Sequence, residues 1–353
     1  MHAGGRHTKR CVIMKILLLT LLLFVLFACD ANGEEANTYQ NPVFEPVIAD
    51  PSIIRAEDGT FYAYGTEDAW NHSTDFRYAP IIKSDDLVNW EYIGDVFDQK
   101  PDWKGFAYIW APDIQYFNDQ YYLYYSLSVW GDSNPAIGVA TADSPEGPFT
   151  DHGKLFDSEE IGVNNSIDPF VFITEDGELW MFWGSFHGIY AIQLTEDGLD
   201  TVGEKVHIAG NAFEAPYVIY KDGYYYFFAS IGSCCAGAGS TYQVRVGRSE
   251  NLLGPYVDRQ GRGLLGSQGS LVIGDGEQFV GNGHNSVIQD DAGDYWLIYH
   301  GIDREEAYLP GGATRRPLMI DKIVWDSQGW PQVRNFRPSE DETEAPYINF
   351  EEE

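Results

Sequence analysis

The chain has 353 residues, with 54 acidic against 22 basic side chains and a formal net charge of −32. A negative field of this size disfavours nucleic acid, anionic lipid surfaces and polyanionic substrates, so we expect a neutral substrate. Aromatic residues make up 15% of the chain and charged residues only 22%, which indicates a soluble protein built mainly from strands.

The N-terminus has the pattern of a targeting segment. Met14-Lys15 precedes an apolar run over residues 16–28, which has the length of a signal-peptide core and is short for a membrane span. Translation starts either at Met1 or at Met14. The run ends in Leu-Phe-Ala before Cys29, which resembles a bacterial lipoprotein cleavage box. We therefore predict a signal peptide over 1–28, lipidation of Cys29 and an acidic tether over 29–39, with an ordinary signal peptide as the alternative.

A short pattern recurs five times after the tether: an apolar run, a hairpin turn and a strand rich in aromatic residues. Equivalent positions are 61, 57, 46 and 70 residues apart, and one propeller blade takes ~40–50 residues before loops are added. No long 3.6-residue period with caps follows residue 39, so helices should be few. The copies are Ala49–Gly65, Ala111–Ser126, Ile167–Ser185, Phe213–Ser230 and Gly283–Gly301.

These units predict an all-β fold, a five-bladed β-propeller over residues 40–338. A β-sandwich is the competing all-β fold, but a fivefold repeat of this length argues against it. The acidic residues 339–353 are expected to form a loosely held tail. We expect a monomer.

One position of the repeat carries ionisable side chains. Nine residues upstream of four turn glycines stand Asp50, Asp168, Glu214 and His284, and the second copy has Ala111 there. In a propeller, a fixed point of each blade lies on a ring around the axis, so these side chains should converge. Carboxylates brought close raise at least one carboxyl pKa, which gives an acid and a base in one cleft. Inverting glycoside hydrolysis requires such a pair. A single Asp before Pro would more often only bond to local backbone.

Four segments together resemble glycoside hydrolase family 43, and the resemblance spans residues 40–335. Each short motif alone is weak evidence, but the ordered set at these spacings is specific. The segments are Ile48–Ser52, Trp110–Asp113, Asn165–Pro169 and Phe213–Tyr217.

The resemblance implies a role for each carboxylate. Asp50 would be the general base that takes a proton from the attacking water. Glu214 would be the general acid, and Asp168 would orient Glu214 and modulate its pKa. No carboxylate acts as a nucleophile, so the anomeric configuration should invert.

Within the family, the segments Ser233–Gly237, Ser240–Tyr242 and Arg245–Ser249 look most like those of endo-acting arabinanases, which implies cleavage of internal α-1,5-L-arabinofuranosyl linkages of arabinan. An exo-acting α-L-arabinofuranosidase or β-xylosidase with the same site is the alternative, and a non-catalytic sugar-binding propeller is a third. Gly281–Asn285 resembles the segment that holds a central cation, usually calcium, through a histidine and waters. This implies a calcium ion at His284 and no organic cofactor.

Further residues are candidates for contact with the sugar chain. Trp110 and Phe213 flank the ring positions and could stack on a furanose, with core packing as the alternative. The resemblance includes Asp113, which is a further candidate. Either Arg315 or Arg316 could bond sugar hydroxyls, and Arg315 is the one chosen here. Cys234 and the following cysteine are adjacent, and either a vicinal disulfide or two buried thiols fits. The protein is expected to be exported, as a cell-surface or periplasmic lipoprotein, or secreted if Cys29 is not lipidated.

Overall fold

The computed structural model describes residues 37–349, so the predicted signal peptide, Cys29 and most of the tether lie outside the described residues. The expectation of a β-rich fold is confirmed. Helical structure in this range is limited to α2 (Ser158–Ile161) and the 3-10 turns η1 (Gly237–Gly239) and η2 (Arg334–Phe336). None of these is long and apolar enough to cross a membrane.

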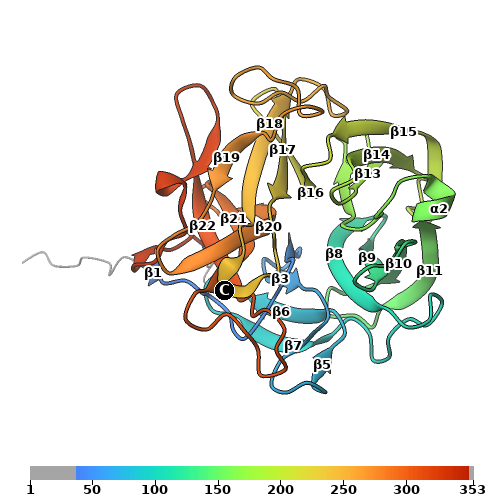
Figure 1. Ribbon diagram of the computed structural model, residues 1–353, viewed down its shortest axis with the longest axis horizontal. Coiled ribbons are helices and arrows are strands. Elements are labelled where there is room, and N and C mark those ends of the chain that lie inside the picture. The colour runs from blue at the N-terminus through green and yellow to red at the C-terminus, as the bar shows by residue number, and fades with distance from the viewer. Residues whose placement is uncertain (1–36, 350–353) are drawn as a thin grey trace, which may run out of the picture. The chain divides into compact units, whose positions relative to one another are not determined.

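Three four-stranded antiparallel sheets follow one another along the chain (Figure 1). The first contains β2 (Ser52–Arg55), β3 (Phe61–Tyr64), β6 (Pro80–Ser84) and β7 (Glu91–Asp95). The second contains β8 (Tyr108–Phe117), β9 (Gln120–Ser128), β10 (Ala136–Ala142) and β11 (Thr150–Asp157). The third contains β12 (Phe170–Ile173), β13 (Leu179–Trp183), β14 (Ile189–Leu194) and β15 (Thr201–Ala209).

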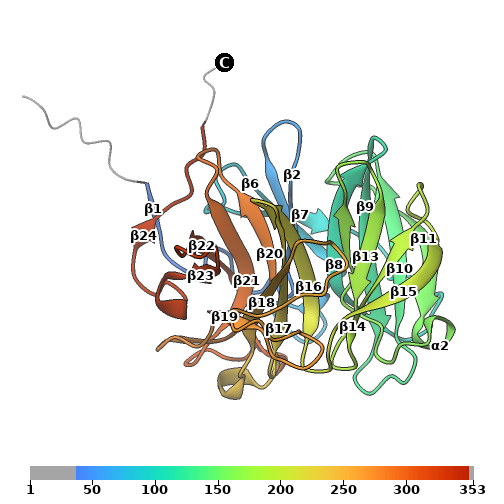
Figure 2. The same cartoon turned by 90° about the horizontal axis from the view of Figure 1, so that it is seen from above.

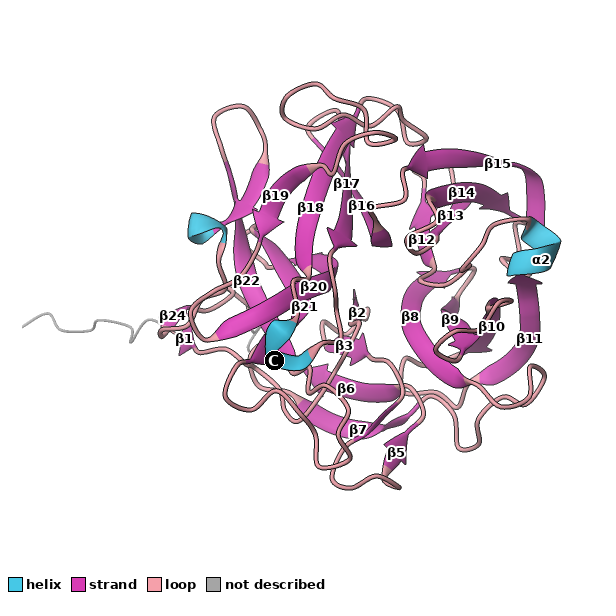
Figure 3. Cartoon of the chain, in the orientation of Figure 1, coloured by secondary structure: helices cyan, strands magenta, loops and turns pink. Residues whose placement is uncertain are grey.

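The remaining strands form one eight-stranded sheet and two short ribbons (Figures 2 and 3). The large sheet contains β16 (Glu214–Lys221), β17 (Tyr224–Ile231), β18 (Gln243–Ser249), β19 (Ser270–Ile273), β20 (Phe279–Gln289), β21 (Tyr295–Asp303), β22 (Leu318–Trp325) and β23 (Pro331–Val333). Its halves join by a single parallel pair between Gln243 of β18 and Asn282 of β20. The ribbons pair β4 (Asp68–Ala69) with β5 (Phe76–Arg77), and β1 (Thr38–Tyr39) with β24 (Thr343–Glu344).

The first strands of the five repeats contact one another in a closed circuit. Strand β2 lies against β8 and β20, β12 lies against β8 and β16, and β16 lies against β20. Apolar side chains fill the space between neighbouring sheets; Tyr124 and Ile137 of the second sheet, for example, pack in one cluster with Met181 and Trp183 of the third. The core is therefore divided among the sheet interfaces, and the starts of the first strands are brought together.

Each first strand has a residue with positive φ, either just before the strand or within it. These residues are Asp50 (55°), Ala111 (43°), Asp168 (59°), Ala215 (54°) and His284 (49°). Two positions later, every strand pairs with its hairpin partner: Ser52 with Tyr64, Asp113 with Tyr124, Phe170 with Phe182, Tyr217 with Phe228 and Ser286 with Ile298.

The repeat position of the fourth copy is therefore Ala215, and the prediction that Glu214 occupies it was wrong by one residue. In the first, third and fifth copies, the hairpin turn spans five residues, as between Arg55 and Phe61. In the fourth copy, Lys221 pairs directly with Tyr224 across a two-residue turn. The residue nine positions before the turn glycine Gly223 is therefore Glu214, which stands one residue before the repeat position Ala215.

The loosely held tail expected over residues 339–353 is also corrected, as far as residue 349. Strand β24 pairs with β1, and Ala345 and Ile348 pack in the apolar cluster around Tyr39. The backbone N–H groups of Tyr347 and Asn349 donate to Asp290 and Asp291. Apolar residues among the acidic ones attach this segment beside the N-terminal strand.

Asn41 fastens the N-terminal segment to β22. Its Nδ2 donates to the carbonyl of Ile320 at 2.8 Å, and its Oδ1 accepts from the N–H of Ile320 at 2.9 Å. Asn41→Ala should lower the free energy of unfolding by about 1–3 kcal/mol, because a buried N–H then loses its partner. Denaturant unfolding measures this, with the exposed neighbour variant Gln40→Ala as the control. Equal stability of the two variants would refute the role of Asn41.

Candidate active site

A cavity of about 990 Å³ lies where the first strands begin, and Asp50, Asp168, Glu214 and His284 all line it. The three carboxylates come from β-strand starts more than 160 residues apart in sequence, from residue 50 to residue 214. Each of the three side chains is buried except toward the cavity. The predicted convergence of these four residues in one site is thus observed.

Asp50 is held ionised by its neighbours. Arg316 Nη1 donates to both carboxylate oxygens, at 2.9 and 3.1 Å, and Thr66 Oγ1 donates to Oδ2 at 2.6 Å. His284 Nδ1 lies 3.2 Å from Oδ1. Burial by itself would raise the pKa of Asp50, but the charges of Arg316 and His284 hold this pKa well below its usual range. A buried carboxylate that stays ionised is suited to act as a general base.

The two histidines beside Asp50 differ in charge. His300 Nδ1 accepts the backbone N–H of Asp50 at 3.1 Å, which places the imidazole proton on Nε2. Burial lowers the pKa of His300 to about 4, so this ring is neutral. Burial opposes the charging of His284 as well, but the carboxylates of Asp50, Asp168 and Glu214 raise its pKa. The three carboxylates therefore favour the charged form of the His284 imidazole.

Asp168 and Glu214 are shifted in the opposite direction from Asp50. Burial raises the pKa of both, and negative neighbours add to it: Glu214 and Asp50 for Asp168, and Asp50 for Glu214. Ser185 Oγ donates to Glu214 Oε2 at 2.7 Å, and the N–H of Ala215 donates to Asp168 Oδ2 at 3.1 Å. The cavity thus holds one ionised carboxylate together with two that retain protons more readily.

Three predicted substrate contacts lie away from the cavity lining. Phe213 is 1% exposed and packs edge-on against Phe227. It therefore belongs to the core, which was the alternative to a sugar contact. Asp113 is buried and accepts bonds from Ser52 Oγ and from the N–H of Val171, which ties β8 to β2 and β12; burial raises its pKa to about 7. Arg315 pairs with Glu45 and Glu306 at the surface.

Trp110 lines the cavity as predicted, and sequence reasoning missed several of its neighbours. Trp130 is 78% exposed, Tyr308 59% and Phe186 38%, and all three line the cavity from loops that follow β9, β21 and β13. Trp110 and Trp130 lie with ring centroids 5.7 Å apart. These loop residues fall outside the strand pattern, so the repeat gave no signal for them. Exposed aromatic faces around a cavity are suited to bind sugar rings.

His284 is the candidate metal ligand. Within residues 37–349 there is no group of three or more His, Cys, Asp or Glu side chains that could hold a metal ion. Calcium prefers oxygen ligands, so the side chains present fit only a cation that keeps most of its water and contacts one imidazole. The imidazole would have to give up its proton to bind such an ion.

An aromatic-lined cavity that holds two carboxyl groups with pKa values shifted in opposite directions fits a glycoside hydrolase that works by acid–base catalysis. The comparison with known families agrees. The family model of glycosyl hydrolases family 43 matches residues 39–331, and the chain belongs to this family. The family resemblance noted in the sequence is thus confirmed.

Similar proteins include arabinan-cleaving enzymes of both modes. The chain is 33% identical over 299 residues to the extracellular endo-α-(1→5)-L-arabinanase 1 of Bacillus subtilis (81% of this chain, 87% of the relative). It is 34% identical over 315 residues to the extracellular exo-α-(1→5)-L-arabinofuranosidase ArbA of Cellvibrio japonicus (81% and 86%). The solved Cellvibrio cellulosa α-L-arabinanase complexed with arabinohexaose superposes with a TM-score of 0.72 at 31% identity (82% of this chain, 96% of that one).

Arg316→Gln should move the acidic limb of the pH profile. Without the guanidinium the pKa of Asp50 rises, so the base becomes protonated at higher pH and activity is lost earlier on acidification, by about 1–3 pH units. The pH dependence of kcat/KM on a glycoside substrate measures this. Arg315→Gln, the neighbour outside the cavity, is the matched control and should keep the wild-type profile. An unmoved acidic limb in Arg316→Gln would exclude the proposed control of Asp50.

Proposed function

We propose that this protein is an inverting glycoside hydrolase that cuts internal α-1,5-L-arabinofuranosyl linkages of arabinan. The observation that carries the proposal is that Asp50 and Glu214 face one cavity with pKa values shifted in opposite directions. Relatives named endo-arabinanases, which match most of the chain, support the substrate and the mode.

In the proposed reaction, the ionised carboxylate of Asp50 takes a proton from a water molecule as the water oxygen bonds to the anomeric carbon. The bond from that carbon to the leaving sugar oxygen breaks, and Glu214 gives this oxygen its proton. Burial and the negative charge of Glu214 raise the pKa of Asp168, and Asp168 Oδ2 accepts the N–H of Ala215, the residue after Glu214. The product has the inverted configuration, because water enters on the face opposite the leaving sugar.

We also propose that the described sheets form a five-bladed β-propeller. Three sheets have four antiparallel strands, and the eight-stranded sheet divides into two such sets where only the Gln243–Asn282 pair joins them. The circuit of contacts among β2, β8, β12, β16 and β20 supports a circular order.

We propose a calcium ion beside His284, held by the imidazole and by water. When bound, it would add positive charge near the three carboxylates. The residues of the chain carry every proton transfer of the mechanism, and the ion takes no direct part in them.

We propose export of the protein, on the basis of the predicted signal peptide and of relatives named extracellular. We also propose that Cys29 is lipidated and that this anchor is the protein's contact with the membrane. We propose a monomeric state. Cys29 lies outside the described residues. The lipid anchor would hold the enzyme at the membrane surface, outside the cytoplasm, while the cavity stays in water.

Exo action is the second candidate, because one relative of similar identity is named an exo-enzyme. The distribution of exposed aromatic side chains favours endo action. Trp130, Phe186 and Tyr308 line the cavity from three different inter-strand loops. A polymer that crosses the cavity could contact more than one of them, whereas a closed pocket would enclose a chain end.

A time course on debranched linear arabinan tests the function and separates the two modes. Endo action should release a mixture of oligosaccharides early, with monosaccharide appearing late, and xylan should remain intact. Anion-exchange chromatography of the products measures this. Arabinose as the sole early product would replace endo with exo action, and no release from arabinan or arabinoxylan would reject the proposed hydrolase.

The roles of Asp50 and Glu214 can be separated with two isosteric variants. On arabinan, Glu214→Gln and Asp50→Asn should each lower kcat by about 10²–10⁴-fold. On an aryl arabino-oligoside, whose phenolate leaves without a proton, Glu214→Gln should recover much of this loss and Asp50→Asn should recover none. Steady-state kinetics on both substrates measure the difference. Equal losses on both substrates for the two variants would contradict the assignment of acid and base.

A further inference from the structure

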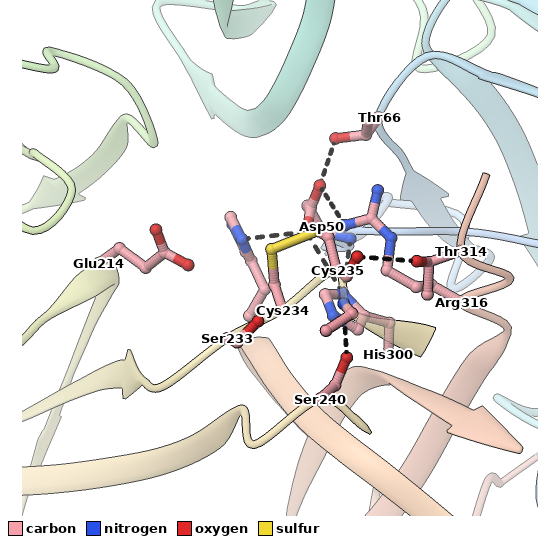
Figure 4. The surroundings of a disulfide bond; sticks show 12 residues. Asp50, Thr66, Glu214, Ser233, Cys234, Cys235, Ser240, His300, Thr314 and Arg316 are labelled. Atoms are coloured by element: carbon pink, nitrogen blue, oxygen red, sulfur yellow. Dashed lines mark hydrogen bonds and ion pairs between the residues drawn. A yellow bond between two sulfur atoms is a disulfide. The ribbon is translucent and has the colours of Figure 1, made fainter. Parts of the chain in front are cut away.

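The two adjacent cysteines are joined in a disulfide that lines the catalytic cavity (Figure 4). Of the two states left open by the sequence, the structure has the disulfide. Cys234 and Cys235 lie in the loop between β17 and β18, and both side chains are partly exposed. Figure 4 shows them in the same part of the molecule as Asp50, Glu214 and Arg316. The mechanism gives this disulfide no role.

The loop that carries the disulfide is held firmly from several sides. Thr314 Oγ1 donates to the carbonyl of Cys235 at 3.1 Å, and it belongs to the loop between β21 and β22. Within the cysteine loop, Ser240 Oγ accepts the N–H of Ala236 at 2.9 Å, and Thr241 Oγ1 accepts the N–H of Ser233 at 3.1 Å. The position of the disulfide is therefore fixed before any ligand binds.

Tyr308 packs over the same loop. A Cβ atom on Gly237, whose φ is +56°, would collide with the Tyr308 phenol. Glycine at this position allows the ring to approach the backbone. Tyr308 and the two cysteines all line the cavity, so the disulfide and an exposed aromatic ring together make one apolar section of the wall.

This section of wall has the chemistry of a surface for the C–H face of a sugar. Oxidised sulfur atoms have no S–H donor, and sulfur is soft and polarisable. A fixed surface loses little conformational entropy when a ligand binds to it. Arg316, Asp50 and Asp68 line the cavity as well and provide polar partners for hydroxyl groups. A furanose ring that bonds to these groups on one side needs an apolar contact for its carbon-bound hydrogens on another.

We propose that the Cys234–Cys235 disulfide is a substrate-contacting surface, on which one arabinofuranose residue of the bound chain packs. The inference rests on the proposed arabinan hydrolase function. Opening the disulfide to two thiols separates the sulfur atoms and removes the fixed S–S surface, so binding should weaken while the proton transfers at Asp50 and Glu214 remain intact. The predicted effect is on affinity for the sugar chain, not on kcat.

The test measures binding of linear α-1,5-arabinohexaose to the Glu214→Gln enzyme by titration calorimetry, with and without Cys234→Ala/Cys235→Ala. We expect the Kd to rise about three- to tenfold in the absence of the disulfide, and KM of the otherwise wild-type enzyme to rise by a similar factor with kcat within about twofold. Ala238→Ser, in the same loop and outside the cavity lining, is the matched control and should leave Kd and KM unchanged.

Reduction of the folded wild-type enzyme by a phosphine provides a second measurement. The phosphine gives up two electrons and becomes its oxide with oxygen from water, while the S–S bond breaks and each sulfur gains a proton. The reduced enzyme should show the same rise in KM, reversed by re-oxidation, and the double alanine variant should not respond. Unchanged KM on reduction, or a loss confined to kcat or to thermal stability, would overturn the proposal. If one of these results is found while the wild type still cleaves arabinan, only the inference about the disulfide fails. If the wild type neither binds nor cleaves arabinan, the proposed hydrolase function fails as well.

Discussion

The ion pair between Asp50 and Arg316 is the contact on which the site depends. Three carboxyl groups in one largely buried cavity would repel one another if all were ionised. Arg316 bonds both oxygens of Asp50, and His284 lies beside the same carboxylate. One carboxylate is therefore kept charged, while burial and that charge raise the pKa values of the other two. The division into base and acid follows from which carboxyl the guanidinium contacts.

The backbone explains how these side chains come to face one cavity. Asp50 and Asp168 precede their strands and His284 lies within β20, all with φ between 49° and 59°, a region that costs non-glycine residues about 1–3 kcal/mol. Strand pairing two residues later fixes the chain in this geometry. The strained backbone persists because the five hairpins pack against their neighbours and so fix the backbone conformation at these positions.

The sequence predicted the repeat, the β-rich fold and the converging residues, since alternation and turn residues are local signals. Glu214 was found by counting from a two-residue turn, which is shorter than the turns of the first, third and fifth copies, and its side chain lines the cavity all the same. Of the two neighbouring arginines, Arg315 was chosen as the sugar contact, but Arg316 is the one that lines the cavity, and its ion pair with Asp50 was not predicted. Which of two adjacent side chains on a loop faces the cavity is decided by packing. Asp113 and Phe213 have motif neighbours in the site but side chains in the core.

Glu214 differs from the other two carboxylates in its backbone position. Asp50 and Asp168 occupy the repeat position of their copies, whereas Glu214 stands one residue before it. The repeat position of the fourth copy is Ala215, whose N–H donates to Asp168. Asp168 thereby fixes the backbone from which Glu214 projects as well as influencing its charge. Asp50 and Asp168 thus share one backbone position of the repeat and Glu214 stands one residue before it. The three carboxylates have different surroundings although they come from copies of one repeated unit.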